Sequence, residues 1–190
     1  QFSDGLKQIL WGLFKKLVVA DNIATITSPL FESYHTLNGS ALFIGAVLYF
    51  IQLYSDFSGY TDMAVGISKI LGIKVQPNFN YPLFAQNVAD YWRRWHISLT
   101  GWLTEYVFTP LSINFRDYGK FGLISAIIIN FLVVGFWHGA EWHYIVHGLV
   151  SGIMFIPIIW LGKMSKKVKL TNTVLPSFSE LKNIPITFVL

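Results

Sequence analysis

Two histidines lie in sequence contexts suited to proton transfer. His138 ends a long uncharged stretch, in Gly135-Phe-Trp-His-Gly139. An imidazole titrates near neutral pH, so it can accept a proton from a hydroxyl and return it to a leaving group. The two glycines would leave room for a ligand to approach closely. We therefore take His138 as the leading candidate for a general base.

The second histidine, His96, follows Tyr91-Trp-Arg-Arg-Trp95. Its apolar surroundings fit a buried structural histidine and a functional one equally well. Arg93 and Arg94 either anchor a helix at the lipid headgroups, the favoured interpretation, or bind an anionic acyl donor such as a coenzyme A or phosphopantetheine phosphate. The residue types thus leave both roles open.

Acidic side chains gather after an apolar stretch, where Asp56 and Asp62 are surrounded by Ser55, Ser58 and Thr61. A supporting role, with hydrogen bonds and an arginine partner, is favoured over direct chemistry. Glycine and serine in this segment would allow the helix either to unwind or to pack closely.

Other catalytic chemistries find little support in the sequence. With no cysteine, the chain has no thiol nucleophile, disulfide or cysteine-bound metal. No Gly-x-Ser-x-Gly elbow marks a nucleophilic serine. His143 and His147 are four residues apart near Glu141, as metal ligands on a helix can be, but no convincing third ligand follows from the spacing. We predict no metal site.

The elements that position these residues are expected to lie in a membrane. The 190 residues are 53% hydrophobic and 13% charged, whereas soluble domains are about 25% charged. The net charge of +4 comes from basic residues near segment ends. We interpret this charge as a signal for membrane orientation and predict no nucleic-acid binding.

Uncharged stretches predict membrane spans near residues 36–55, 121–140 and 142–162. The last two form a helical hairpin if the chain turns at Gly139-Ala140-Glu141. That turn places several basic residues on one side, which should be cytoplasmic: Arg116, Lys120, Lys163, Lys166, Lys167 and Lys169.

Two further segments are amphipathic. Residues 6–18 have the pattern of a helix lying along the headgroups. Residues 88–108 read as one helix with His96 on its apolar stripe, and with Asp90 and Arg94 paired on a face turned away from it. An ordered loop is expected between the prolines at 77 and 82. The fold class predicted is all-α: a polytopic membrane helical bundle with interfacial amphipathic helices.

Four motifs, in this order, resemble the membrane-bound O-acyltransferase family. They are Leu53-Tyr-Ser-Asp-Phe-Ser-Gly-Tyr-Thr-Asp-Met-Ala-Val-Gly66, Asn78-Phe-Asn-Tyr-Pro82, Tyr91-Trp-Arg-Arg-Trp-His-Ile-Ser-Leu99 and Phe136-Trp-His-Gly-Ala-Glu-Trp142. The resemblance covers most of residues 6–161 and is nearest to the bacterial alginate O-acetyltransferase branch, which is related to the D-alanyl transferase of teichoic acid. His143 and His147 occupy places that are more often apolar or aromatic in the family.

The resemblance implies a helical bundle around a tunnel, with His138 as the essential catalytic residue and His96 as a second functional histidine. Within the matched motifs we expect substrate contacts from Asp56, Asn80, Arg93, Arg94, Trp95 and Trp137. Residues 1–190 would then form one partial domain, an internal piece of a longer chain that begins here at Gln1 and stops in the apolar run 184–190.

The resemblance also implies the reaction. We expect transfer of an acyl group, acetyl as the first hypothesis, from acetyl-coenzyme A or an acyl carrier thioester to a hydroxyl of an extracytoplasmic polysaccharide. The donor is a cosubstrate, and no bound cofactor is expected. A multi-pass location in the bacterial inner membrane, among lipid and with periplasmic or secreted acetyltransferase partners, completes this expectation.

Other functions remain open at this point. D-alanyl transfer to teichoic acid is the alternative within the same family. Intramembrane aspartate and histidine would also suit a proton-coupled transporter, although no inverted repeat is visible. A membrane scaffold that recruits a separate transferase is the third possibility.

Overall fold

The computed structural model describes residues 1–162 and 164, which form helices joined by turns and loops, with no strand among them. The all-α prediction is therefore confirmed. The chain divides into two compact units, Gln1–Asn78 and Phe79–Leu190. Lys163, Lys166, Lys167 and Lys169, which were predicted to lie on the cytoplasmic side, are outside the described residues. The apolar run 184–190 is outside them as well.

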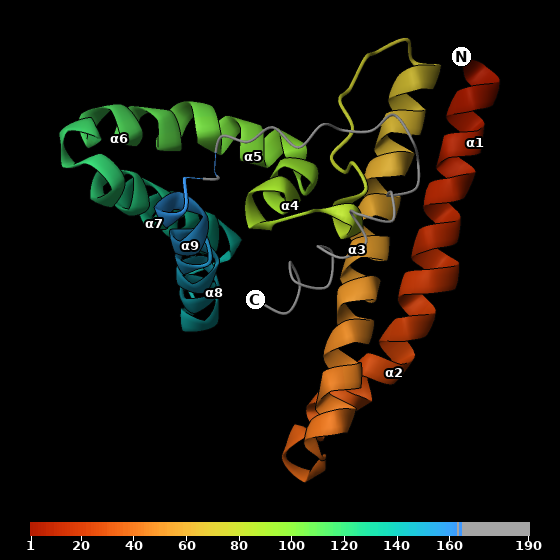
Figure 1. Ribbon diagram of the computed structural model, residues 1–190. Helices are drawn as coiled ribbons and strands as arrows, with labels where there is room; N and C mark the ends of the chain where they lie inside the picture. Colours follow the sequence, from red (N-terminus) through yellow and green to blue (C-terminus); the bar gives the residue numbers. More distant parts are fainter. Residues whose placement is uncertain (163, 165–190) are drawn as a thin grey trace. The chain divides into compact units, whose positions relative to one another are not determined.

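The first unit is a long helical hairpin (Figure 1). Its first arm consists of α1 (Phe2–Leu13), a π-helical segment η1 (Phe14–Ala20) and α2 (Asp21–Glu32), followed by the short turn η2 (Tyr34–Thr36). The second arm is the single helix α3 (Gly39–Ile70). Asn38 caps α3, because its side chain accepts a hydrogen bond of 2.9 Å from the amide of Ala41.

Glycines let the two arms approach each other closely. Gly5 faces Gly66, and Gly12 faces Gly59, so glycines seven residues apart on one helix meet glycines seven residues apart on the other. A Cβ atom on Gly12 would lie 2.5 Å from the carbonyl oxygen of Gly59. Small residues permit this backbone contact between helices, as they do in membrane helix pairs.

This packing corrects the expectation that residues 6–18 lie along the headgroups. Helix α1 runs antiparallel to α3 along its length (Figure 1). Since α3 is one of the helices long and apolar enough to cross a membrane, α1 follows a candidate span instead of crossing it. The apolar stripe of α1 produced the amphipathic pattern seen in the sequence. Gly5 and Gly12, however, determine that the helix packs against α3.

Helix α3 also extends well past the span predicted at residues 36–55 and does not unwind at its serines and glycines. Of the two outcomes considered for this segment, close packing is the one observed. Ser55, Ser58 and Thr61 are buried, and the Thr61 hydroxyl donates to the carbonyl of Ser58 within the helix. The Ser58 hydroxyl accepts a 3.0 Å hydrogen bond from Lys15, so the hydroxyls of Ser58 and Thr61 are satisfied without breaking the helix, which continues to Ile70.

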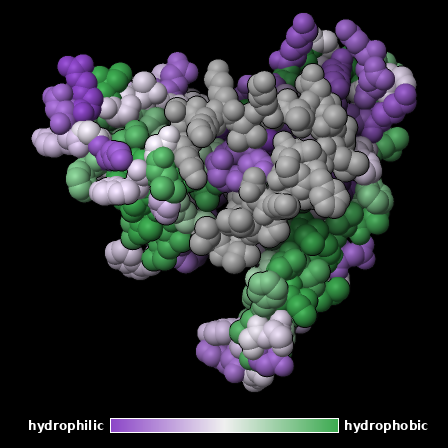
Figure 2. Space-filling model, viewed as in Figure 1, coloured by the Kyte–Doolittle hydropathy of each residue, from purple (hydrophilic) through white to green (hydrophobic). Residues whose placement is uncertain are grey.

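Within residues 1–162 and 164, three stretches are long and apolar enough to cross a membrane: Gly39–Ile70, Arg116–His138 and Trp142–Trp160. Large apolar side chains are exposed along α3, and Figure 2 shows hydrophobic residues gathered over the α2–α3 part of the hairpin. These include Phe43, Ile44, Val47, Ile51 and Leu53. Exposed apolar bands of this kind are typical of a surface that faces lipid.

The second unit packs short helices against a second hairpin. Its elements in order are η3 (Pro82–Phe84), α4 (Val88–Arg94), α5 (Ile97–Leu103), η4 (Thr104–Phe108), α6 (Thr109–Asn114), η5 (Arg116–Tyr118), α7 (Gly119–His138), α8 (Trp142–Ile153) and α9 (Ile156–Trp160). Side chains from α4, α5, α7 and α9 share one apolar core, which includes Val88, Leu103, Ile127, Phe131 and Ile159. This core holds α4 and α5 against the α7–α8 hairpin.

The predicted hairpin turn at Gly139-Ala140-Glu141 is confirmed, because α7 ends at His138 and α8 begins at Trp142. The two arms meet at Gly135 and Gly148, where a Cβ atom on Gly148 would lie 3.3 Å from the Cα of Gly135. At the other end of the hairpin, Lys120 donates a 3.0 Å hydrogen bond to the carbonyl of Trp160. The start of α7 and the end of α9 therefore lie together, as the hairpin requires.

Candidate functional site

The segment containing His96 is not the continuous helix expected over residues 88–108. Helix α4 ends at Arg94, Trp95 is extended, and His96 adopts the left-handed conformation with φ 48° and ψ 52° before α5 begins. Such a conformation costs a non-glycine residue roughly 1 kcal/mol or more, so the surrounding contacts must hold it. The amide of Thr100 donates to the carbonyl of His96 at 2.9 Å, which secures the break at the start of α5.

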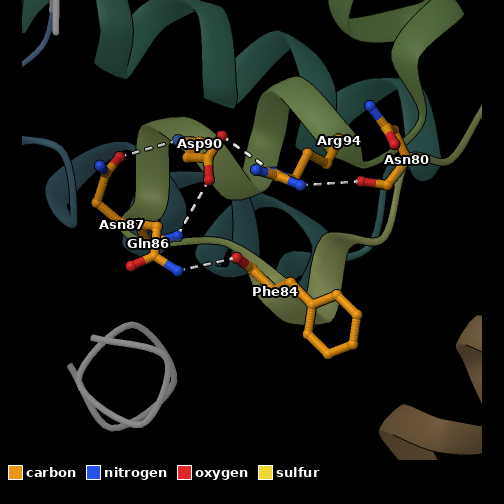
Figure 3. A network of polar contacts seen from close by, with 6 residues as sticks. All are labelled: Asn80, Phe84, Gln86, Asn87, Asp90 and Arg94. Atoms are coloured by element: carbon orange, nitrogen blue, oxygen red, sulfur yellow. Dashed lines mark hydrogen bonds and ion pairs between the residues drawn. The ribbon is translucent and has the colours of Figure 1, made fainter. Parts of the chain in front are cut away.

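A buried polar network fixes the helix before this break (Figure 3). Asn87 caps α4 by accepting from the amide of Asp90 at 2.9 Å, and Asp90 accepts from the amide of Gln86 at 3.0 Å. The other Asp90 oxygen lies 3.0 Å from Nε of Arg94. Arg94 in turn donates to the carbonyl of Asn80 at 3.4 Å, while the Asn80 amide donates to the carbonyl of Arg94 at 3.0 Å.

The predicted ion pair of Asp90 with Arg94 is therefore present. It lies on the buried face of α4, whereas the prediction placed it on the face turned away from the apolar stripe. Both residues are buried, with 4% and 9% of their surfaces exposed, whereas the expected helix had them turned away from the core. In this position Asp90 meets the amide of Gln86 and Arg94 meets the carbonyl of Asn80. The pair and its hydrogen bonds attach the loop that contains Asn80 to the end of α4, as expected for an ordered loop.

This geometry separates the two arginines. Arg94 is engaged inside the unit, whereas Arg93 is exposed and donates a 2.9 Å hydrogen bond to the carbonyl of Met164. Substrate contacts by Arg93, Arg94 and Asn80 stay predictions. The observed contacts give Arg94 and Asn80 a positioning role beside His96.

Aromatic rings hold the tryptophans of this segment in place. Trp95 stacks on Tyr91 with ring centroids 5.6 Å apart, and the edge of Phe79 meets Trp95 at 4.9 Å. Trp92 packs against Phe131 of α7 at 4.9 Å. Burial raises the pKa of Tyr91 well above its usual range, so this phenol stays neutral and serves as packing.

The structure brings His96 and His138 to the same end of α7. The ring of Trp137 lies 5.9 Å from that of His96 and 4.8 Å from that of His138, so it contacts both. The pKa of His96 lies below its usual value, because burial disfavours the charged imidazole and a charge on His138 would repel it. His96 is thus held in its neutral form beside a second imidazole.

The surroundings of His138 include Tyr144, which the sequence did not mark, and His147, which the sequence offered only as a possible metal ligand. Tyr144 of α8 stacks on the His138 ring at 6.0 Å, and His147 meets it edge-on at 6.5 Å. The space expected beside the glycines is filled, since a Cβ atom on Gly139 would lie 2.7 Å from the Tyr144 ring and one on Gly135 would overlap the Tyr144 carbonyl. These glycines therefore admit α8, and the expectation that they leave room for a ligand is wrong.

Asp56 belongs to the first unit and has a lysine partner instead of the arginine considered. Its carboxylate lies 2.5 Å from Lys16, which also pairs with Asp21 at 2.9 Å. The two carboxylates raise the pKa of Lys16 above its usual range. The neighbouring Asp62 pairs with Lys15 and accepts a 3.1 Å hydrogen bond from Gln8. These contacts agree with the supporting role for Asp56, and a substrate contact stays a prediction.

No group of three histidine, aspartate or glutamate side chains suited to a metal converges within residues 1–162 and 164. His143, one of the two histidines considered as ligands, instead lies 3.3 Å from Glu141. The arrangement at the end of α7 therefore offers nitrogen bases, one neutral by burial and one exposed, next to an aromatic ring. Such groups can move a proton during acyl transfer.

Comparison with known proteins identifies the family. The membrane-bound O-acyltransferase family model matches residues 3–174. The chain belongs to this family. The O-acyltransferase family resemblance inferred from the four motifs is thereby confirmed, and with its apolar helices the chain is part of a membrane protein.

Three relatives show the range of this O-acyltransferase family. The chain is 37% identical over 153 residues to the probable alginate O-acetylase of Pseudomonas putida, covering 80% of this chain and 31% of the relative. It is 44% identical over 142 residues to the peptidoglycan O-acetyltransferase of Helicobacter pylori, covering 75% and 27%. With the teichoic acid D-alanyltransferase of Bacillus subtilis, identity is 32% over 174 residues, covering 87% and 43%. The chain thus spans less than half the length of these relatives.

Proposed function

We propose that the protein is a membrane O-acyltransferase in which His138 is the general base. The observation that carries this proposal is the placement of His96 and His138 around Trp137, at the end of a candidate membrane span. The two histidines are 42 residues apart in the sequence, yet the fold brings both rings to Trp137. Membership of the acyltransferase family favours this chemistry over a proton-coupled transporter or a scaffold.

The proposed reaction is a proton-assisted acyl transfer. His138 accepts the proton of an acceptor hydroxyl as the hydroxyl oxygen attacks the carbonyl carbon of a thioester. A C–O bond forms, the C–S bond breaks, and the proton passes from His138 to the departing sulfur. His96, neutral and half-buried, is suited to hydrogen-bond the hydroxyl or the carbonyl oxygen.

The names of the relatives guide the choice of substrates. Alginate and peptidoglycan O-acetylation support acetyl transfer to a polysaccharide outside the cytoplasm. The donor would be acetyl-coenzyme A or an acyl carrier thioester, with Arg93 as the exposed cation for its phosphates. D-alanyl transfer to teichoic acid is the second candidate, because a relative of that name aligns with 87% of the chain.

The cellular setting follows from the same argument. An acyl donor made in the cytoplasm and an acceptor outside it require an enzyme that crosses the inner membrane several times. Three candidate spans in the part of the chain that the structure describes support a multi-pass protein. Delivery of the acyl group to a polymer would involve a periplasmic or secreted acetyltransferase partner.

The test compares His138→Ala with the unchanged protein in its own host, by mass spectrometry of the cell-surface polymers. We expect acyl groups to disappear from one polymer while the variant remains in the membrane at normal abundance. His35→Ala, which alters an exposed histidine in η2, is the control and should keep acylation. Persistence of acylation in His138→Ala would overturn the proposal, and the mass of the lost group distinguishes acetyl from D-alanyl.

A further inference from the structure

A third imidazole adjoins the site. His147, in the second turn of α8, meets the ring of His138 at a centroid distance of 6.5 Å and an interplanar angle of 86°. Neither the metal hypothesis nor the proposed mechanism gives it a role. Its position beside the base therefore needs a separate explanation.

The packing of α8 on α7 fixes the position of His147. Gly148, the next residue, is buried against α7, and a Cβ atom there would overlap the carbonyl of Phe131. Gly135 is similarly closed off by α8. Because the two backbones touch on both sides of this contact, α8 cannot shift easily relative to His138, and the distance between the two imidazoles is set by the hairpin itself.

The distance between the His138 and His147 rings is compatible with a water-mediated contact and not with a direct hydrogen bond. Centroids 6.5 Å apart are too distant for a direct N–H···N hydrogen bond but within reach of one bridging water. Tyr144 lies nearly parallel to His138, with an interplanar angle of 18° and ring centroids 6.0 Å apart. His147, by contrast, has its ring plane nearly perpendicular to that of His138, at 86°.

A general base works best when another group fixes which of its nitrogens carries the proton. The ionisable groups of α8 and its preceding turn that lie near His138 are Glu141, His143, Tyr144 and His147. Glu141 pairs with His143, and the Tyr144 ring contacts both His138 and His143. On α7, the neighbouring ring is that of Trp137, which has only an N–H donor. Of these groups, His147 is the imidazole whose ring meets that of His138, and a neutral imidazole nitrogen can accept from an N–H.

We propose that His147 is a positioning residue for the base, holding the N–H of His138 through one water so that the opposite nitrogen faces the acceptor hydroxyl. This inference rests on the proposed function. No proton is gained or lost overall: the hydroxyl proton passes to His138 and then to the departing sulfur. During the step, the positive charge on His138 is shared through the water with His147.

The test uses the intact protein in membranes, with kcat and KM for acceptor measured separately. We expect His147→Phe to lower kcat by roughly 10- to 100-fold, less than the loss of general base catalysis itself, with little change in KM. His147→Gln keeps groups that can donate and accept, so it should retain most of the activity. Imidazole added to His147→Ala should restore kcat, whereas pyrazole, a ring of the same size but far less basic, should not.

The matched control is His143→Phe, one turn earlier on the same helix, which should leave kcat unchanged. Full activity in His147→Phe, with none in His138→Ala, overturns this inference and leaves the proposed function standing. Activity in His138→Ala overturns the proposed function itself. Equal losses in the Phe and Gln variants without rescue by imidazole indicate packing alone and also overturn the inference. Should the Phe variant not accumulate, the Gln variant and the imidazole rescue decide the question.

Discussion

Asp90 and Arg94, one helical turn apart in α4, form an ion pair that is buried in the second unit. Trp95 alone separates Arg94 from His96 in the sequence. The pair links the helix to the loop at Asn80. It therefore holds the end of α4, where the backbone breaks before His96.

Removal of one member of this pair should destabilise the second unit strongly. We expect Asp90→Asn to lower the free energy of unfolding by about 3 kcal/mol, because it leaves the Arg94 charge buried without its counter-ion. Thermal unfolding of the purified protein measures the change. The control is Asp117→Asn, which breaks an ion pair with Arg116 whose side chains are 85% and 76% exposed, and which should change stability by less than about 0.5 kcal/mol. Equal effects in the two variants would show that burial of the pair is unimportant.

The glycine contacts of the first unit predict a sharp sensitivity to a single methyl group. Gly12→Ala places a Cβ atom 2.5 Å from the carbonyl oxygen of Gly59, and we expect a loss of roughly 1–3 kcal/mol from overpacking. Gly39→Ala, in the first turn of α3, meets nothing within 4 Å and should be neutral or slightly stabilising. Thermal unfolding compares the two variants. A tolerated Gly12→Ala would contradict the close approach of α1 and α3.

A double-mutant cycle tests the support that Lys16 gives to Asp56. We expect Lys16→Gln and Asp56→Asn each to reduce stability slightly, and the double variant to lose less than the sum. The coupling should be no more than about 1 kcal/mol, because both side chains are substantially exposed, at 40% and 48%. Strictly additive losses would mean that the two charges do not stabilise each other.

The surroundings of His96 predict a stability that falls in mild acid. Its pKa in the folded protein lies below the value of 6.5 expected when unfolded, so the unfolded chain binds a proton more readily. Stability should therefore be undiminished above about pH 7 and decrease as the pH falls through 6.5. His96→Asn, whose side chain tolerates the left-handed backbone, should show a smaller decrease. Thermal midpoints of both proteins between about pH 8 and 5.5 provide the comparison, and parallel curves would refute the prediction.

Much of the fold could be predicted from the long stretches of sequence that contain no charged residue. The long uncharged stretches and the single turn at Gly139-Ala140-Glu141 predicted the α7–α8 hairpin, since few charges are tolerated in a span of about 20 residues. The spacing of Asp90 and Arg94 predicted their ion pair for an equally local reason. These features depend on residues near one another in the chain, which the sequence displays directly.

Features that depend on tertiary contacts were missed. Nothing in the residue types marks His96 as left-handed, because the break depends on the network around Asp90 and on the contacts of Trp95. Stacking of Tyr144 on His138 likewise requires the close packing of two helices. One available signal was the seven-residue spacing of Gly5 with Gly12 and of Gly59 with Gly66, which predicts paired helices when both repeats are read together.

The length of α3 has a consequence for where the charges of the hairpin lie. At 32 residues the helix is about 48 Å long, whereas the hydrocarbon of a bilayer is about 30 Å thick. With Gly39 at one edge of the hydrocarbon, the opposite edge is reached after about 20 residues, near Ser58. The ion pair of Lys15 with Asp62 then lies at headgroup depth, where water and lipid phosphates can solvate it. Asp56, 17 residues after Gly39, is about 25 Å along the helix and just inside that edge, where its pairing with Lys16 keeps the carboxylate from being buried alone.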